Sequence, residues 1–462
     1  MKTVLANVSN SFFVRNFLRS DPLKILESNG NVRLVLLVPK KKLEYYRSEF
    51  PSSNIIFDVM PEVNLFRVEK LFKFLETASI YTNTSLMLSK HNLYRTGSKD
   101  FVVFRYLSFF VRYIIWQVGR TRVWREFLRS VYLSFSNDAY DEILEKYLPD
   151  LVFLPSMIYV EDYIVAKAAK KKGVKTLGMT LSWDNFYSKT LLLVKPDILM
   201  VHTGLIVEQA KNLGDYDSGK IVVTGIPQYD RYFKKEGLIS RDEYFRKIGA
   251  DPSKKLILYA FSGKAGIDIE FSVLEILHKV INEGKISKEV QVLLRPYPRY
   301  DFSDDKLDEL RKKYGFLAQQ PVSHPVGGSD DWEFNAESLN FLSNSLAHAD
   351  LVITMYSTFF IEAAIFDRPL IAAGFDGAKN LDYWNSSKRF FDWDHLSELK
   401  PLNGIKIVRN QAEFVMAING YLENPTLLSE GRKQIVLQQS QFTDGESGMR
   451  LAKTILGALG LE

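Results

Sequence analysis

Short runs of Val, Ile and Leu alternate with longer helix-like stretches along most of the 462 residues. Continuous apolar runs flanked by helices are typical of parallel strands whose sheet is covered by helices on both faces. The pattern therefore predicts an α/β protein. In the first half, the predicted strands are residues 3–8, 32–38, 54–59, 151–154, 175–179 and 198–202.

The alternation of strands and helices restarts after Asp230, beyond a stretch rich in Lys, Arg, Asp and Glu at residues 231–254. A chain of this length has room for two or three domains. We therefore predict two Rossmann-like domains, residues 1–232 and 233–462, with a closing helix at 444–461. In the second half, the predicted strands are residues 255–261, 290–295, 350–354, 369–373 and 405–407.

Composition excludes several classes of site. The chain has no Cys, which excludes a disulfide scaffold, thiolate metal sites and a Cys nucleophile. Its 60 Lys and Arg against 55 Asp and Glu give a net charge of +5, too small over this length to indicate a nucleic-acid-binding protein. The six His residues show no paired metal-ligand spacing, and no HExxH, EF-hand or DxD pattern occurs, so no metal site is predicted.

The clearest candidate site lies at residues 350–369, DLVITMYSTFFIEAAIFDRP. A buried strand is followed by a turn that carries Tyr356, Ser357 and Thr358, and then by a helix. Hydroxyl and free backbone N–H groups at a helix N-terminus suit an anion such as phosphate, and ligands of parallel sheets bind beyond the strand ends. Glu362 lies one helical turn further on, placed to accept hydrogen bonds from ribose hydroxyls. A plain helix N-cap explains the same hydroxyl residues equally well.

Two further loops follow neighbouring strands of the second half. The first, SGKAG, offers glycines and a lysine for close approach by a diphosphate, although its spacing is not that of a P-loop. The second, RPYPR, offers two guanidinium groups between prolines. The candidate ligands in these loops are Ser262, Gly263, Lys264, Arg295, Tyr297 and Arg299.

These motifs stand in a fixed order: RPYP at 295–298, Ala349-Asp350, Tyr356-Ser357-Thr358, Glu362 and Arg368-Pro369. The set resembles the donor domain of GT-B glycosyltransferases, among them bacterial capsular and surface polysaccharide enzymes and the CDP-glycerol glycerophosphotransferases. The resemblance covers the second half of the chain well and the first half loosely. It implies two Rossmann-like domains facing a cleft, with the first on the acceptor side and the second binding a nucleotide-linked donor.

The resemblance also implies roles for single residues. Ser357 and Thr358 correspond to the turn that binds the donor phosphates in such enzymes, and Glu362 to the acid that binds the nucleotide ribose. Tyr297 departs from the pattern because the glycerophosphotransferases usually carry His there. This departure favours transfer of a sugar over transfer of glycerol phosphate, and the missing DxD pattern favours metal-independent transfer.

Candidates for the catalytic base lie in the first half. Asp184, in the LSWDN segment after a predicted strand, is placed to accept a proton from an attacking hydroxyl group. Asp and Asn also favour turns, so a purely structural role explains the same residues. Glu161, in the first turn of a predicted helix, is the second candidate, with stabilisation of the helix dipole as its alternative role.

Aromatic residues make up 13% of the chain, and many of them lie with six arginines in residues 101–135. Read as one helix, this segment has a broad apolar stripe with Arg105 and Arg112 near one border. A basic, aromatic amphipathic helix suits the surface of an anionic membrane, while a core helix, a homodimer face or an acceptor-binding feature explains the same pattern.

Together, these features predict a glycosyltransferase that moves a sugar from a nucleotide-sugar donor to a glycan or lipid-linked acceptor in surface polysaccharide synthesis, with no cofactor. The alternatives are a CDP-glycerol-type polyol-phosphate transferase, a non-hydrolysing nucleotide-sugar epimerase and an inactive GT-B-like binding protein. We interpret the first residues as a strand rather than a signal peptide, and no uncharged apolar stretch of about 18 residues occurs in the sequence. We therefore expect a cytoplasmic protein, with contact to the inner face of the cytoplasmic membrane or homodimerisation left open.

Overall fold

The computed structural model describes residues 1–63, 67–263, 266–297, 304–318 and 332–461. The chain divides into two compact units. Unit 1 comprises residues 1–93, 97–230 and 439–462, and unit 2 comprises residues 94–96 and 231–438. The units differ from the predicted ranges 1–232 and 233–462 chiefly at the C-terminus, because residues 439–462 return to unit 1.

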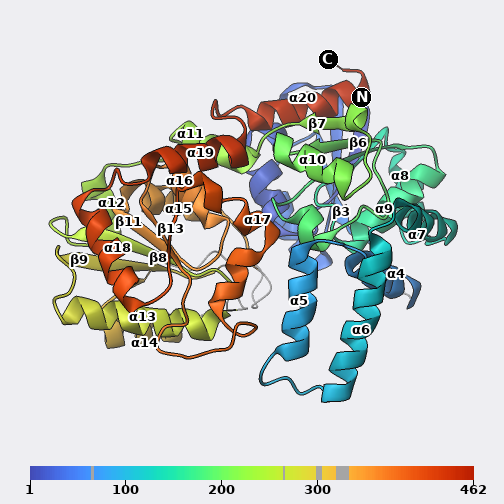
Figure 1. Cartoon of the computed structure of the whole chain (residues 1–462). Coiled ribbons are helices and arrows are strands. Elements are labelled where there is room, and N and C mark those ends of the chain that lie inside the picture. Colours follow the sequence, from blue (N-terminus) through green and yellow to red (C-terminus); the bar gives the residue numbers. More distant parts are fainter. Residues whose placement is uncertain (64–66, 264–265, 298–303, 319–331, 462) are drawn as a thin grey trace. The chain divides into compact units, whose positions relative to one another are not determined.

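Unit 1 contains a seven-stranded parallel sheet with the strand order β3-β2-β1-β4-β5-β6-β7 (Figure 1). Chain order reverses between β1 and β4, which is the point where ligands of such sheets usually bind. The first six of these strands coincide with the predicted ones to within two residues. The strands are β1 (Lys2–Asn7), β2 (Val32–Val38), β3 (Ile55–Val59), β4 (Leu151–Leu154), β5 (Lys175–Met179), β6 (Ile198–Val201) and β7 (Ile221–Val223).

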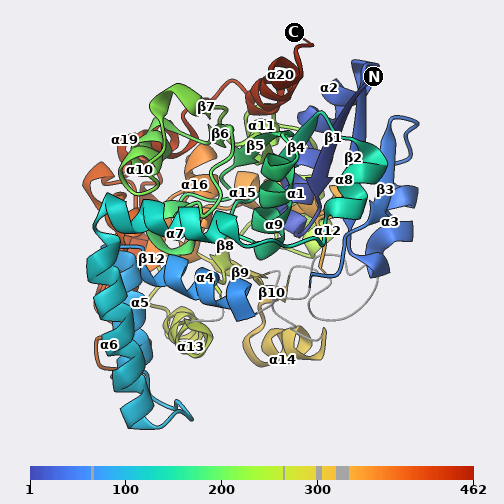
Figure 2. The same cartoon turned by 90° about the vertical axis from the view of Figure 1, so that its right-hand side faces the viewer.

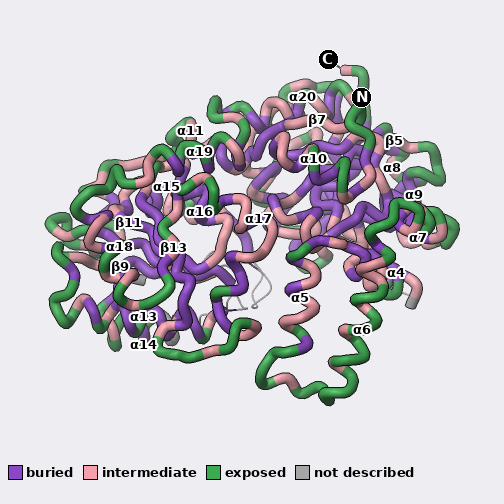
Figure 3. The backbone as a smooth tube through the Cα atoms, in the orientation of Figure 1, coloured by how far each residue is buried: buried purple, intermediate pink, exposed green. Residues whose placement is uncertain are grey.

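Two apolar clusters cover the two faces of this sheet. Alternate residues of one strand supply the two clusters: Val4 and Ala6 of β1 belong to one, and Leu5 belongs to the other. This alternation is the period of two that a strand imposes on its side chains. Because both sets are apolar, the strands read as continuous apolar runs, and Figure 3 shows them buried at the centre of the unit.

Helices flank the sheet of unit 1 on both sides. The C-terminal helix α20 packs on α2, where Leu451, Ile455 and Leu459 join the same cluster as Leu23 and Leu26. The helices are α1 (Ser11–Phe13), α2 (Asp21–Ser28), α3 (Leu43–Glu49), α4 (Arg67–Ala78), α5 (Asn83–Tyr94), α6 (Val102–Gly119), α7 (Arg122–Ser134), α8 (Asp141–Tyr147), α9 (Val160–Lys171), α10 (Gly204–Asn212) and α20 (Ser447–Leu459). Helix α11 (Pro227–Phe233) begins in unit 1, and its residues from Arg231 on belong to unit 2.

Unit 2 contains a six-stranded parallel sheet with the order β10-β9-β8-β11-β12-β13, so chain order reverses between β8 and β11. Its strands are β8 (Lys255–Ala260), β9 (Val290–Arg295), β10 (Leu317–Ala318), β11 (Leu351–Thr354), β12 (Leu370–Ala373) and β13 (Lys406–Val408). Its helices are α12 (Arg241–Ile248), α13 (Ile267–Asn282), α14 (Asp304–Tyr314), α15 (Ala336–His348), α16 (Phe359–Ile365), α17 (Asp394–Ser397), α18 (Gln411–Glu423) and α19 (Ser429–Ser440).

The segment 101–135, predicted as one helix, forms two helices, α6 and α7, which pack against α4 (Figure 2). The break follows Gly119, whose backbone touches Ser79 so closely that an added Cβ would lie 2.2 Å from the Ser79 carbonyl oxygen. In the described part of the chain, no helix is long and apolar enough to cross a membrane.

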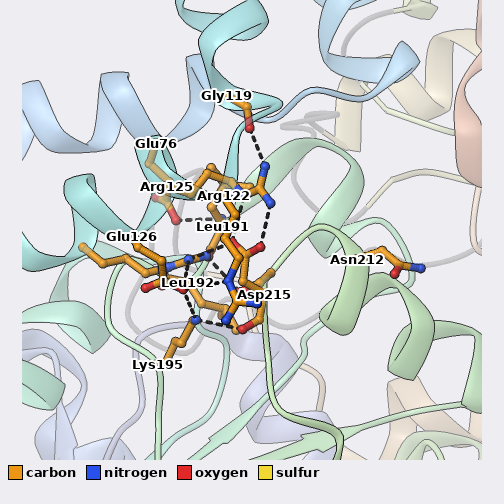
Figure 4. Close-up of polar contacts among 12 residues, drawn as sticks. Glu76, Gly119, Arg122, Arg125, Glu126, Leu191, Leu192, Lys195, Asn212 and Asp215 are labelled. Atoms are coloured by element: carbon orange, nitrogen blue, oxygen red, sulfur yellow. Dashed lines mark hydrogen bonds and ion pairs between the residues drawn. The ribbon is translucent and has the colours of Figure 1, made fainter.

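A buried ion-pair cluster ties α7 to two loops of unit 1, at residues 191–195 and 214–215 (Figure 4). Arg125 donates two hydrogen bonds to the Asp215 carboxylate, at 2.8 and 2.6 Å, and a third at 2.6 Å to the Gly119 carbonyl at the end of α6. Arg129 donates to Asp215 at 2.8 Å and to the carbonyls of Leu191 and Gly214. Burial alone would raise the pKa of Asp215, but the hydrogen bonds from both arginines outweigh it and lower that pKa.

Candidate functional site

The candidate donor site of unit 2 lies at the carboxyl ends of β8 and β11. These two strands are hydrogen-bonded neighbours, and chain order reverses between them. The SGKAG loop follows β8, and the turn 355–358 follows β11. The sheet therefore brings two of the three predicted loops together at the edge where parallel sheets bind ligands.

Ser262 joins these two loops. Its Oγ accepts hydrogen bonds from the backbone N–H groups of Met355 at 3.1 Å and Tyr356 at 2.9 Å, and it lies 3.1 Å from the Thr354 hydroxyl. These bonds occupy the Ser262 hydroxyl and two of the turn's donors. Ser262 thus braces the turn, and its predicted contact with a ligand stays a prediction.

The remaining donors of the turn belong to Ser357 and Thr358. Among the described residues, neither of their backbone N–H groups has a hydrogen-bond partner, and the Thr358 side chain makes no capping bond. The Ser357 hydroxyl accepts a hydrogen bond from the Phe359 N–H at 3.2 Å. It therefore pairs one of the first N–H groups of α16, as the helix N-cap interpretation of the sequence predicts. The two unpaired N–H groups leave the turn able to bind an anion as well.

Glu362 lies in α16 with 4% of its surface exposed. The Tyr232 hydroxyl donates to its Oε2 at 2.7 Å. Tyr232 is a partner that sequence motifs did not indicate, because it comes from α11, 130 residues earlier. A buried carboxylate held by one hydroxyl group retains acceptor capacity on its second oxygen.

The RPYPR loop is described as far as Tyr297, which is half-buried. The Arg295 guanidinium lies 5.0 Å from the ring centre of Phe359, the first residue of α16, so its positive charge lies close to the turn. Gly263 has a φ of +148°, a conformation that favours glycine. Lys264 and Arg299, which were also predicted to contact the donor, lie outside the described residues.

Aromatic and basic side chains after β12 border the same turn, and the sequence did not indicate them. The ring of Tyr356 stacks on Phe390 with centres 3.7 Å apart, and Trp393 meets it edge-on. Arg389 is only 2% exposed, lies 4.3 Å from the Phe390 ring centre and donates to the Ser386 carbonyl at 2.7 Å. Burial lowers the pKa of Arg389.

Beneath the SGKAG loop lies a buried carboxyl group, that of Glu270 in α13. Its Oε1 accepts a bond from the Ser262 N–H at 2.9 Å, whereas its Oε2 has no partner among the described residues. Burial raises the pKa of Glu270 to about 8, although the Ser262 bonds oppose this shift. The group therefore supports the loop mainly in its protonated form near neutral pH.

We expect Glu270→Gln to become increasingly stabilising as the pH rises from about 4.5 to about 8. The folded pKa lies above the ordinary value of 4.5, so the folded state must hold a proton that the unfolded state loses. Stability from this group is full below pH 4.5 and is lost as the pH rises through 8. The variant should gain up to about 1.4 kcal/mol per pH unit over the native protein, measured by urea unfolding.

The control for this experiment is Glu275→Gln, which changes an exposed carboxylate of the same helix. Its stability curve should run parallel to that of the native protein across the same pH range. A parallel curve for Glu270→Gln as well would show that the buried carboxyl group does not titrate in this window.

The predicted base candidates lie in unit 1. Asp184 precedes a short helical turn at Asn185–Lys189, and its carboxylate forms an ion pair with Lys189 at 2.7 Å. Glu161 is half-buried in the first turn of α9. The next residue, Asp162, is fully buried and accepts bonds from Ser156 and the Met157 N–H.

Polar atoms without partners gather at the strand ends of unit 1. Among the described residues, Asp162 Oδ1, Thr180 Oγ1 and His202 Nε2 are buried and make no hydrogen bond. Thr180 follows β5, and His202 follows β6. Burial raises the pKa of Asp162 to about 6 and lowers that of His202 to about 4. Unsatisfied buried polar atoms are rare, so this edge is suited to a polar ligand.

The model of the CDP-Glycerol:Poly(glycerophosphate) glycerophosphotransferase family matches residues 193–457, more than half of the chain. The chain belongs to this family. The matched range contains every donor-site residue described above, whereas Asp184 and Glu161 lie outside it. No curated protein shows a significant match to the sequence.

Solved structures confirm the GT-B fold that the sequence predicted for this glycerophosphotransferase family member. A UDP co-structure of MnaA from S. aureus has 13% identity and a TM-score of 0.56, over 100% of this chain and 98% of that one. The UDP-GlcNAc 2-epimerase of Neisseria meningitidis, bound to UDP-GlcNAc, has 10% identity and a TM-score of 0.53, over 99% and 100%. A glycosyltransferase from Rickettsia africae has 12% identity and a TM-score of 0.50, over 98% of both chains.

Family membership and fold together support a transferase that uses a nucleotide-linked sugar or polyol phosphate. The likeness to the epimerases extends to the fold alone at 10–13% identity. Among the described residues, no group of three His, Asp or Glu side chains is placed to hold a metal ion.

Proposed function

We propose that this glycerophosphotransferase family member transfers a sugar from a nucleotide-sugar donor to a glycan or lipid-linked acceptor at the inner face of the cytoplasmic membrane. The observation that carries the proposal is the turn after β11, where the N–H groups of Ser357 and Thr358 have no partner among the described residues. Together with the nearby Arg295 guanidinium, they suit a donor diphosphate.

The donor would bind at the carboxyl edge of the unit 2 sheet. Ser357 and Thr358 would donate hydrogen bonds to the phosphates, and Glu362 would accept from the nucleotide ribose. As the bond from the sugar to the leaving phosphate breaks, negative charge grows on the phosphate oxygens. Fixed N–H dipoles and the Arg295 charge would stabilise that charge without a metal ion.

The acceptor hydroxyl must lose a proton as it attacks the sugar. We propose Asp184 as the base that takes this proton, with Glu161 as the second candidate. The ion pair with Lys189 balances the charge of the Asp184 carboxylate in the resting protein. The products are the glycosylated acceptor, the nucleoside diphosphate leaving group and one proton, which the base takes up.

Transfer of a polyol phosphate from a CDP-linked donor is the second candidate function. The family match favours it, because the family is described as a glycerophosphotransferase. Tyr297 argues against transfer of a polyol phosphate, because the glycerophosphotransferases that the sequence resembles usually carry His at this position. Both functions use the same phosphate-binding turn, so the identity of the donor nucleotide and the transferred group separates them.

A thermal-shift screen with UDP-, GDP-, CMP- and CDP-linked compounds tests both functions, since a ligand of the folded state raises the melting temperature. We expect one nucleotide class to raise it in the native protein. Replacing both turn residues, with Ser357→Pro and Thr358→Pro, removes the two N–H donors and should weaken binding of that compound by about 100-fold. Binding is measured by titration calorimetry.

The matched control keeps the backbone donors and removes only the hydroxyl groups, with Ser357→Ala and Thr358→Val. This control should lose much less affinity than the proline variant, which must also retain its far-UV circular dichroism spectrum. Equal affinity of the proline variant and the native protein would refute the phosphate-binding turn. Failure of every nucleotide compound to bind the native protein would refute both proposed functions.

A further inference from the structure

The antiparallel pair of helices α5 and α6, here called the hairpin (residues 79–121), has its apolar residues on the outside. Arg105 near one end of α6 donates to the Leu93 carbonyl of α5. Trp116 near the other end donates to the Thr82 carbonyl at 3.2 Å. Figures 1 and 2 show the two helices extending away from the sheet of unit 1.

The inner face of α6 carries the polar groups. Arg112 lies with its guanidinium 4.7 Å from the ring centre of Phe74 in α4, and burial lowers the pKa of Arg112. Arg105, Arg112 and Trp116 are spaced by seven and four residues, so they share one helical face. The sequence placed Arg105 and Arg112 near one border of the apolar stripe. In the structure, they face the protein.

The outer face of α6 is apolar and exposed. Figure 3 shows much of this helix in the colour of exposed residues. Phe104 is 64% exposed, Leu107 56% and Phe110 60%. An ordinary helix of a soluble unit places such residues against the core. Large exposed apolar patches mark surfaces that contact a partner or a membrane. The exposed apolar residues of this segment are Phe101, Val102, Val103, Phe104, Tyr106, Leu107, Phe110, Val111, Tyr113, Ile114 and Val118.

The charge of the hairpin indicates which kind of partner fits the apolar face of α6. The hairpin contains six Lys and Arg residues and a single acidic residue, Asp100, a net charge of +5 that equals the net charge of the whole chain. Lys99 before α6 and Arg120 after it are both exposed. The basic residues therefore flank the apolar face at both of its ends. A second copy of the chain in a two-fold pair would set this positive charge against itself, whereas anionic lipid headgroups would neutralise it.

We propose that the outer face of α6 lies in the headgroup region of an anionic bilayer and attaches the protein to it peripherally. Phe104, Leu107 and Phe110 enter the boundary between headgroups and acyl chains, as the apolar faces of interfacial helices do. Lys99 and Arg120 contact lipid phosphates at the two ends of the helix. This attachment does not depend on the chemistry proposed for unit 2. It would keep the enzyme close to an acceptor that is anchored in the same membrane by its lipid.

Sedimentation with vesicles tests this surface. The native protein should bind vesicles of equal parts phosphatidylglycerol and phosphatidylcholine at least about 10-fold more strongly than vesicles of phosphatidylcholine alone, and added salt should reduce the difference. The triple variant Phe104→Ser, Leu107→Ser and Phe110→Ser should bind the mixed vesicles about 100-fold more weakly. Because these side chains are exposed, its melting temperature should match that of the native protein.

Two controls make the result specific. Leu71→Ser, Met416→Ser and Leu437→Ser replace three equally exposed apolar residues elsewhere and should leave vesicle binding unchanged. Lys99→Gln with Arg120→Gln should remove the preference for phosphatidylglycerol and keep weak binding to both vesicle types. The proposal is overturned if the native protein does not bind the mixed vesicles or if the serine triple variant binds them as well as the native protein does. It is also overturned if the native protein is a stable dimer that this triple variant splits into monomers.

Discussion

Replacing Asp215 with alanine is expected to lower the free energy of unfolding by about 3–5 kcal/mol. The guanidinium groups of Arg125 and Arg129 are 4% and 5% exposed at the side chain, and both donate to this carboxylate. Without it, two positive charges stay buried, and their remaining partners among the described residues are carbonyl groups, the Tyr81 ring and the more exposed Glu126. Urea unfolding followed by circular dichroism measures the loss.

The matched control is Asp217→Ala, two residues further along the chain. Asp217 is exposed and accepts a single bond from the Gly219 N–H at 3.0 Å, so its loss should cost no more than about 1 kcal/mol. The contrast between two aspartates of the same loop measures the buried ion pairs together with the smaller backbone strain that alanine takes on at the Asp215 φ of +52°. A loss at Asp215 no larger than at Asp217 would show that the cluster adds nothing to stability.

The Asp215 cluster also contacts the C-terminal end of the hairpin, through Arg125. Arg125 donates to the Gly119 carbonyl as well as to Asp215, so the end of α6 and the loop before β7 share one guanidinium. The close approach of Gly119 to Ser79 holds the same point from the other side. These contacts hold the C-terminal end of α6 against the rest of unit 1, while the exposed apolar residues of the helix stay outside the core.

The strands could be predicted from the sequence because their signal is local. Residues 32–38 were predicted as a strand and form one, since both faces of the sheet are apolar and every position of the run is therefore apolar except Arg33. The edge strand β7 was not predicted. Its apolar run, Ile221–Val223, is only three residues long and is not fully buried, so it is too short to mark a strand by itself.

The break between α6 and α7 could not be predicted, because its cause is distant in the sequence. Gly119 is tolerated in a helix and becomes decisive only where the Ser79 backbone presses against it. The inward orientation of Arg105 and Arg112 could not be predicted either, because their partners, Leu93 and Phe74, belong to other helices. Helical periodicity identifies a stripe of residues but does not say which stripe faces the protein.

The candidate donor site likewise combines features that could be predicted from the sequence with features that could not. The turn at Ser357 and Thr358 was found because a strand, a turn and a helix follow one another along the chain. The brace from Ser262, the bond from Tyr232 to Glu362 and the buried Arg389 were not found, because each joins segments that only the folded sheet brings together. Sequence motifs thus indicate the candidate loop, while the groups that hold it in place emerge only from tertiary structure.

Replacing Asp184 with asparagine is expected to lower kcat by about 10²–10⁴-fold with the donor identified in the screen. Asparagine keeps the size of the side chain and its carbonyl acceptor for Lys189, but it cannot take up the acceptor proton. Donor affinity should not change, because the proposed donor ligands come from unit 2. Steady-state kinetics and donor titration of the same preparation separate these two effects.

A purely structural role of Asp184 would act through its ion pair with Lys189, so Lys189→Met is the decisive control. If the pair only holds the segment after β5, both variants should lose stability and turnover to a similar extent. If Asp184 is the base, Lys189→Met should keep most of its turnover, and only Asp184→Asn should lose the fall in rate on the acidic side of the pH profile. Full turnover in Asp184→Asn together with a loss in Glu161→Gln would assign the base to Glu161, because proton transfer requires a group whose removal abolishes that acidic limb.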